Sequence, residues 1–497
     1  MSVLIKQKPL YDMLATDEEI IFAVNDIPIV ATKVKVKFTA EIWLSHGAAN
    51  PFTQTKIATL KATPNEAGVG IFDFSRILES YVSPDYLGGK TIVSNGVQYY
   101  TSANQQYYNI NRPHSIHQID KHSVSRNACK RFGIIFNIEY ADNFDEVLQT
   151  GTDAYSGKYY VHNAVRQEDD GLAMEVQTGR FGFNYDHHNF ALNDTDGKFL
   201  TNAPTTQYIG ENDYCTIAYF NQSDSGAGAD TQLGNQIGTI GATDNLVERI
   251  KMQFYYNGSS LGAPNAVNWA NTLANGSSPT ILTNPKVQIQ YTGVGTGNLV
   301  GAGVSLPTNW DYYKVWAEDD DGNEISKDYY FYKQEVCKGF EKFRLTWLNR
   351  LGVWDYFNFT KKNVRKVNSK RETYQQIKGS WNDEIYRKHG YKGGTKTFST
   401  NSKEVITLQT DYITEEAAQW LEELFTSPDV YVLQERAVLD GGSTSSASSV
   451  FFDIINKFIQ PCIVKTSSYT RKTTANDKLK QYTLEIEMSH NKKIQRA

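Results

Sequence analysis

The chain has 497 residues, with 50 Lys and Arg against 55 Asp and Glu and a net charge of -5. At roughly 100–200 residues per domain, this length predicts two to four domains and excludes a small scaffold held together by disulfides. The 31 Tyr, 24 Phe and 8 Trp, together with 36 Gly, favour strands over helices. A charge so close to balance excludes a protein that binds nucleic acid over its whole surface.

The cysteines are far apart in the sequence, at Cys129, Cys215, Cys337 and Cys462. They lack the Cys-x-x-Cys spacing of a metal or redox site, so we expect reduced thiols. The N-terminal residues contain no apolar run long enough for a signal peptide, and no stretch of about 18 apolar residues occurs in the chain. These patterns predict a soluble protein that is not exported by the usual route and does not insert into a membrane.

Strand signals occur from one end of the chain to the other. Apolar and polar side chains alternate over residues 33–44, and the same period of two recurs at 134–140, 287–291, 343–347 and 482–488. Such alternation predicts antiparallel sheets with one buried and one solvated face. Asp-Gly pairs at 196–197 and 321–322 predict two hairpins between strand-like flanks.

Only two segments have the periodicity of a helix. Residues 74–82 place apolar side chains on one stripe behind Asp73 and end at Pro84. Residues 414–426 begin at Thr414, a favourable cap residue, and end before Pro428. Both segments run into Ser-Pro-Asp, which fits either a repeated strand–helix–strand unit or two separate stop signals.

Composition suggests where the domains divide. Residues 222–303 are rich in Gly, Asn, Ser and Thr, so we expect an insertion or a peripheral β domain there. Residues 1–221 then form one or more N-terminal β domains with a short helix near 74–82. Residues 304–376 form β hairpins with a basic strip that pack on the N-terminal domain, and residues 377–497 form a C-terminal domain with the helix at 414–426. A second Gly- and Ser-rich stretch at 441–449 predicts an exposed hairpin tip.

Residues 258–262, Gly-Ser-Ser-Leu-Gly, match the pattern of a nucleophile elbow. They follow an expected strand at 252–256 and precede a segment with helical character at 266–273. An elbow needs a parallel α/β sheet, and this chain shows strand after strand with few helices. We therefore expect an ordinary turn, and keep a hydrolase with Ser260 as nucleophile as an alternative.

Metal and nucleotide motifs are incomplete. His114, His117 and His122 share no helical face, so we expect them in a surface loop rather than around a metal. The acidic turns at 193–197 and 318–322 lack the first Asp of a calcium loop, and the Gly-rich segments at 293–297 and 390–396 have the wrong spacing for nucleotide binding. We expect no metal and no cofactor.

Positive charge is concentrated in one region. Residues 338–397 contain fifteen Lys and Arg against five Asp and Glu. The centre of this region is a basic strip at Lys361, Lys362, Arg365, Lys366, Lys370 and Arg371. Such a strip can dock an acidic protein surface, bind nucleic acid or remain an ordinary solvated strand pair; a protein contact is the interpretation we favour.

Three parts of the chain have a distinctive texture when taken together: residues 60–78, residues 343–352, and a C-terminal set of the 414–429 helix with its Ser-Pro-Asp, Ser467-Ser468-Tyr469 and residues 482–488. Together they resemble virion structural proteins of tailed bacteriophages, especially those infecting Bacteroidota. The C-terminal set is also similar to the small β-barrels of tail-tube, distal-tail and baseplate-hub proteins. The resemblance covers about half of the chain, and residues 222–303 depart from it.

The resemblance implies a structural, non-enzymatic subunit located in the virion tail and assembled in the host cytoplasm. Its implied partners are other virion tail proteins and further copies of itself in a ring, and no nucleic acid. The predicted fold is mainly β, a multidomain antiparallel β-sandwich or β-barrel with two short helices. The expected interface residues are the basic strip and, in the 441–449 tip, Gly441, Gly442 and Ser443.

The first alternative to a structural subunit is a receptor- or glycan-binding tail protein. In that case a host-surface glycan would stack on aromatic side chains such as Tyr255, Tyr256 and Trp269.

Overall fold

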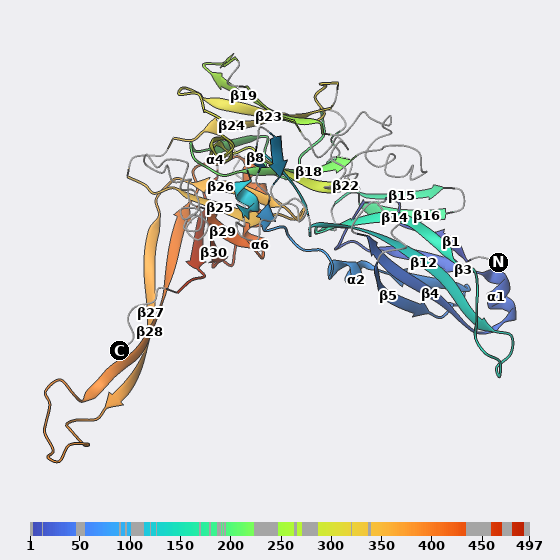
Figure 1. Cartoon of the computed structure of the whole chain (residues 1–497), viewed down its shortest axis with the longest axis horizontal. Helices are drawn as coiled ribbons and strands as arrows, with labels where there is room; N and C mark the ends of the chain where they lie inside the picture. Colours follow the sequence, from blue (N-terminus) through green and yellow to red (C-terminus); the bar gives the residue numbers. More distant parts are fainter. Residues whose placement is uncertain are drawn as a thin grey trace. The chain divides into compact units, whose positions relative to one another are not determined.

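The structure is a computed structural model (Figure 1). It describes residues 3–11, 13–45, 55–88, 91–94, 97–100, 114–119, 121–125, 127–167, 170–177, 180–185, 190, 192, 195–222, 247–262, 266–270, 287–319, 321–335, 339–433, 459–469 and 480–491. The fold is mainly β, with 50% strand and 9% helix, which confirms the predicted class. The described residues form two compact units: unit 1 comprises Met1–Gln334 and Leu348–Asp355, and unit 2 comprises Glu335–Trp347, Tyr356–Gln434 and the described residues from 459 onward.

The first half of unit 1 is a β-sandwich. One sheet has the order β15 (Leu172–Gln177), β16 (Arg180–Tyr185), β1 (Leu4–Gln7), β3 (Ile21–Asn25) and β6 (Val69–Asp73). The other has the order β2 (Met13–Ala15), β14 (Ala154–His162), β12 (Cys129–Ala141), β4 (Val34–Ser45) and β5 (Thr55–Ala62), with β13 (Gln149–Thr150) paired to β12. Aromatic side chains from both sheets meet between them: the Phe22 ring centroid lies 5.5 Å from that of Phe136 and 5.4 Å from that of Tyr159. The predicted alternating strands at 33–44 and 134–140 are therefore confirmed as β4 and β12.

The rest of unit 1 is built from smaller sheets. One has the order β11 (His122–Val124), β22 (Val287–Gly293) and β18 (Thr216–Gln222). Another has the order β17 (Thr206–Ile209), β24 (Tyr329–Lys333), β23 (Tyr312–Glu318) and β19 (Arg249–Tyr256), with β20 (Ser259–Ser260) and β21 (Ala266–Ala270) both paired to β19. Two strand pairs, β7 (Leu87–Gly88) with β10 (His114–Ser115) and β8 (Thr91–Ser94) with β9 (Val97–Tyr100), and the 3-10 turn η3 (Ile116–Gln118) complete it. The described strands within residues 222–303 are therefore paired with strands that come before this segment in the sequence and with strands that come after it.

Unit 2 is one seven-stranded sheet covered by two short helices. Its order is β26 (Trp354–Phe359), β25 (Phe343–Leu348), β29 (Val430–Leu433), β30 (Ile459–Val464), β31 (Thr483–Met488), β28 (Gly394–Gln409) and β27 (Val364–Gln376). The helices α5 (Glu415–Trp420) and α6 (Glu422–Thr426) follow Thr414, whose hydroxyl accepts a hydrogen bond from the backbone N–H of Ala417 at 3.3 Å, as the sequence predicts. Trp420 packs on the sheet, with its ring centroid 5.0 Å from that of Trp347.

Three features differ from the predicted architecture. The unit 2 sheet is open, with β26 and β27 at its ends, so its described strands form no closed barrel. Three strand pairs, β1–β16, β2–β14 and β17–β24, are parallel rather than antiparallel. The turn at Asp196-Gly197 is not followed by a strand in residues 198–200, whereas the turn at Asp321-Gly322 does join the antiparallel strands β23 and β24.

The helices are also more numerous and shorter than predicted. The 74–82 segment contains α2 (Ser75–Glu79), where Asp73 accepts a hydrogen bond from the Ser75 N–H at 3.0 Å although Phe74 occupies the cap position. Two further helices, α1 (Ile27–Thr32) and α4 (Thr296–Gly301), are too short to show a periodicity. A signal for α1 is present in Asp26, which accepts a hydrogen bond from the Ile29 N–H at 3.2 Å, and in the proline of its first turn.

A buried carboxylate joins two segments of unit 1. Glu18 is 2% exposed, and its two oxygens accept hydrogen bonds from the Ala15 N–H at 2.7 Å, the Asn184 amide at 3.0 Å and the Tyr185 N–H at 3.3 Å. Burial raises the pKa of Glu18 from 4.5 to about 6, although these hydrogen bonds act in the opposite direction.

This pKa predicts a pH-dependent stability. Because the folded-state pKa lies above the unfolded value, the contribution of Glu18 is fully present below pH 4.5 and is lost as the pH rises through about 6, a difference of about 2 kcal/mol. We expect Glu18→Gln to remove this component from the free energy of unfolding measured by urea denaturation between pH 4 and pH 7. Parallel pH profiles for the natural chain and the variant would contradict the assignment.

Candidate assembly surface on the β27–β28 hairpin

The β27–β28 hairpin extends beyond the sheet to which it belongs. β28 pairs with β31 only over Val405–Gln409, whereas its pairing with β27 continues out to Gln376 opposite Gly394. We call the outer part, residues 368–403, the hairpin arm; in Figure 1 it is the long orange ribbon that continues past the other strands of unit 2. Within the arm each strand has only the other as its neighbour among the described residues.

A two-stranded ribbon is marginally stable on its own in water. The arm has cross-strand contacts at its base, where the Ser369 and Ser402 hydroxyls are 2.8 Å apart, and further out, where Ser399 donates to Glu372 at 2.8 Å. Its free edges also present unpaired backbone groups, which are a template for another chain. A ribbon of this kind is therefore suited to being covered by a partner.

The predicted basic strip is divided by the structure into two sets. Lys361 is paired with Asp411 at 2.9 Å, and Arg365 is paired with Glu341 and with Glu404, the latter at 3.3 Å. Burial alone would raise the pKa of Asp411, but the hydrogen bonds from Lys361 and from the Tyr412 N–H lower it below its usual range. These two cations serve the fold of unit 2 and are not free for a partner.

The other four residues of the strip, Lys362, Lys366, Lys370 and Arg371, are exposed and have no ion-pair partner in the described parts of the chain. Lys366 and Lys370 lie on one face of β27, and Arg371 lies on the other, because side chains alternate along a strand. Within the arm as a whole, eight Lys and Arg stand against three Asp and Glu, a net charge of +5. The remaining chain therefore carries -10.

The tip of the arm, residues 377–393, has a defined conformation. The Ser380 hydroxyl accepts from the Arg387 N–H at 2.8 Å and donates to the Ile385 carbonyl at 3.1 Å. The Trp381 indole N–H donates to the Lys378 carbonyl at 2.8 Å, and its ring meets that of Tyr386 edge to face at 5.5 Å. These contacts hold the tip without burying it.

Apolar side chains of the arm are left open to solvent. Trp381 is 72% exposed, and the same is true to a similar degree of Ile377, Ile385, Tyr386, Tyr391 and Phe398. Phe398 is the extra residue of a bulge opposite Glu372 and Thr373. So many large apolar side chains on one projection are typical of a surface that a partner covers.

Glycine at position 379 is required by the tip conformation. Gly379 has φ +77°, and an added Cβ would lie 2.5 Å from the Tyr386 ring and 2.7 Å from the Arg387 carbonyl. We expect Gly379→Ala to open the tip and to speed trypsin cleavage after Arg387 and Lys388. The matched variant Gly390→Ala, whose added methyl meets nothing within 4 Å, should leave the cleavage rate unchanged. Equal rates for the two variants would show that the tip is not held in this conformation.

The predicted interface residues Gly441, Gly442 and Ser443, like the rest of 441–449, lie outside the described residues.

A second surface lies on the sheet of β17, β24, β23 and β19. Four tyrosines are opposite one another across these strands, in the order Tyr208, Tyr332, Tyr312 and Tyr255. We call them the tyrosine row. The rings of Tyr255 and Tyr312 are stacked at 4.8 Å and 9°, so they cover each other's faces, whereas Tyr208 at the edge of the sheet is 60% exposed. Of the aromatic residues proposed from the sequence for glycan binding, Tyr255 is in the row and Tyr256 is exposed, but Trp269 is buried.

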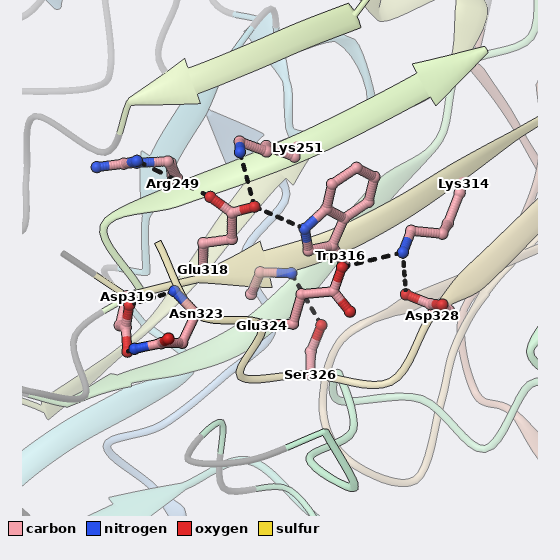
Figure 2. A network of polar contacts seen from close by, with 11 residues as sticks. Arg249, Lys251, Lys314, Trp316, Glu318, Asp319, Asn323, Glu324, Ser326 and Asp328 are labelled. Atoms are coloured by element: carbon pink, nitrogen blue, oxygen red, sulfur yellow. Dashed lines mark hydrogen bonds and ion pairs between the residues drawn. The ribbon is translucent and has the colours of Figure 1, made fainter. Parts of the chain in front are cut away.

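A network of polar and charged side chains (Figure 2) includes Lys314, Trp316 and Glu318 of β23, the strand that carries Tyr312 of the tyrosine row. Glu318 accepts from Lys251 at 2.8 Å and from the Trp316 indole at 2.9 Å. Lys314 lies over the Trp316 ring and contacts Glu324 at 3.1 Å and Asp328 at 2.9 Å. Burial alone would lower the pKa of Lys314, but these two carboxylates raise it above its usual value. The charges are matched within the sheet, so the network orders this surface.

Other motifs from the sequence have structural roles. Asn257 and Gly258 have positive φ and form the turn between β19 and β20, so the Gly-Ser-Ser-Leu-Gly segment is a hairpin, and the expected helix after it is the strand β21. Gly295 packs against the Asp213 carbonyl and the Cys215 N–H, at 2.5 and 2.4 Å from where a Cβ would be, so the 293–297 glycines permit close packing. Neither segment supports the alternative of a nucleophile elbow or a nucleotide site.

Two of the histidines and the acidic turn at 318–322 are likewise used by the fold. His122 is fully buried, with ring nitrogens 2.8 Å from the Thr292 hydroxyl and 3.2 Å from the Trp269 carbonyl, and His117 is buried against Trp354; the expected surface loop is therefore wrong for these two. Asp319 accepts from the N–H and the side-chain amide of Asn323. In the described ranges, no three His, Cys, Asp or Glu side chains are grouped so that they could hold a metal.

No protein-family model matches this chain, and no curated protein is significantly similar to it. Within the described residues, no helix is both long enough and apolar enough to cross a membrane.

Proposed function

We propose that this chain is a structural subunit of the tail of a tailed-phage virion, at the tail tip, distal tail or baseplate, and that it acts by assembling with copies of itself and with other virion tail proteins. The observation that carries the proposal is the hairpin arm, which projects from a well-packed sheet and exposes apolar and basic side chains together. The sequence resemblance to virion structural proteins points in the same direction. The proposal assigns no catalytic step, no cofactor and no nucleic acid.

The physical basis is the difference in burial between the arm and the inner end of the hairpin, which we call the root; there β28 also pairs with β31, over Val405–Gln409. Ile406 and Leu408 at the root are buried, whereas the arm contributes little to any core. Removing the arm should therefore cost little folding stability, while it removes most of the exposed apolar surface of the hairpin. A projecting ribbon whose edges and apolar side chains are left uncovered is suited to repeated contacts in a ring.

The arm can be removed at a defined point. Ser369 and Ser402 are directly opposite in the hairpin, so residues 370–401 can be replaced by Asn-Gly, which forms a two-residue turn. We expect the natural chain to form a closed oligomer and the shortened chain to be monomeric in light scattering at several concentrations. At a concentration where both are monomeric, the two should have the same melting temperature. As a milder variant, Trp381→Ala/Ile385→Ala should weaken the association while keeping the arm at full length. A shortened chain that still forms the natural oligomer would contradict the proposal.

A receptor- or glycan-binding tail protein is the second candidate, because the tyrosine row ends in the exposed face of Tyr208. A sugar ring can stack on such a face, and the Lys314, Glu324 and Asp328 side chains close to the row can hydrogen-bond its hydroxyls. If this candidate is right, Tyr208→Ala should weaken binding of the full chain on a glycan array by about two- to tenfold. Tyr412→Ala, which removes an exposed tyrosine outside the row, is the matched control. Absence of any glycan binding by the natural chain would exclude this candidate.

A further inference from the structure

Unit 1 contains an exposed segment, separate from the tyrosine row, whose charge is opposite to that of the arm. We call it the acidic turn; it comprises residues 139–155, which join β12 to β14 and include β13. The acidic turn has five carboxylates, Glu139, Asp142, Asp145, Glu146 and Asp153, and no Lys or Arg. Its charge of -5 equals in magnitude the +5 of the arm.

The acidic turn is also unusually apolar for an exposed segment. Phe144 is 71% exposed, Val147 is 85% exposed and Leu148 is 50% exposed. These three side chains lie within five consecutive residues and have the solvent as their main neighbour. An apolar cluster surrounded by charge of one sign is typical of a binding surface for a partner that is apolar and of opposite charge.

Part of the negative charge is already neutralised. Asp142 is paired with Lys33, whose hydrogen bond holds the pKa of this carboxyl below its usual range, and Glu139 is paired with Lys61 at 2.7 Å. Asp145, Glu146 and Asp153 have no ion-pair partner in the described parts of the chain. Two of these carboxylates, Asp145 and Glu146, therefore lie within the same five residues as the exposed apolar side chains.

The tip of the arm has the complementary pattern. Trp381, Ile385 and Tyr386 are exposed, and the following Arg387 and Lys388 have no ion-pair partner among the described residues. We propose that the arm of one copy docks on the acidic turn of a second copy, with Trp381 and Ile385 against Phe144 and Val147 and the free cations beside Asp145 and Glu146. This inference rests on the proposed function and specifies which surfaces meet.

The contact has consequences for symmetry and affinity. Two different surfaces meet, so the contact is heterologous, and repeating it gives a ring when the rotation closes. The hydrogen bonds around Ser380 order the tip before binding, so less conformational entropy is lost on docking. The opposite charges favour the correct pairing of surfaces and raise the rate of encounter, so the association should weaken as salt is added.

Reversing the charges on each side tests the contact directly. The arm variant is Arg387→Glu/Lys388→Glu, the turn variant is Asp145→Lys/Glu146→Lys, and a third chain carries all four changes. By sedimentation of the full chain, we expect each of the first two variants to self-associate at least about tenfold more weakly than the natural chain, and the third to recover most of this loss. An equimolar mixture of the first two should assemble with the two variants alternating, because each natural surface then meets a natural one and each reversed surface meets a reversed one.

The control for net charge is Asp17→Lys/Glu66→Lys, which makes the same change as the turn variant at exposed positions outside 139–155. It should assemble like the natural chain. The inference is overturned if the turn variant assembles normally, or if the chain with all four changes is no better than either variant. In that case loss of assembly by the arm-shortened chain would leave the proposed function standing, with the arm docked elsewhere. A natural chain that never self-associates would overturn both.

Discussion

The structure of unit 2 depends on how β28 is paired. At its inner end β28 has two neighbouring strands, and along the rest of its length it has one. Over Val405–Gln409 the strand lies between β27 and β31, and Ile406 and Leu408 are buried. Beyond that point the same two strands continue without a third strand or a core. The hairpin is therefore anchored by the hydrophobic effect at its inner end, whereas the arm is held by backbone hydrogen bonds and a few exposed side-chain contacts.

This division explains how a mainly β chain can be stable and still expose large apolar side chains. The sandwich of unit 1 and the Trp347–Trp420 contact of unit 2 bury the side chains that stabilise the fold. The arm and the acidic turn each carry a group of exposed apolar side chains close together in the sequence, and the two segments have opposite net charge. Among the basic residues, Lys361 and Arg365 form ion pairs within unit 2, whereas those on β27 beyond Arg365 and at the tip place positive charge beside the exposed apolar side chains of the arm.

The sequence predicted the elements whose burial follows a simple period. β4, β12 and β31 alternate because one face packs on a core, and α5 begins at a residue that caps it. It could not predict the arm, because β27 is exposed on both faces and shows no alternation. The tyrosine row could not be predicted for another reason. Tyr208 and Tyr332 are opposite each other because β17 and β24 pair in parallel, and the local sequence does not determine the register of that pairing. The basic strip was found as a charge pattern, but which cations are free depends on Asp411, Glu341 and Glu404, distant in sequence.

Burial of the arm on assembly can be measured by amide hydrogen exchange of the full chain, at a concentration where it is monomeric and at one where it is assembled. We expect fast exchange over residues 368–403 in the monomer and strong protection of the arm on assembly. The Val405–Gln409 end of β28 and the strand β31 should stay protected in both states. Unchanged exchange of the arm on assembly, with new protection elsewhere, would contradict this expectation.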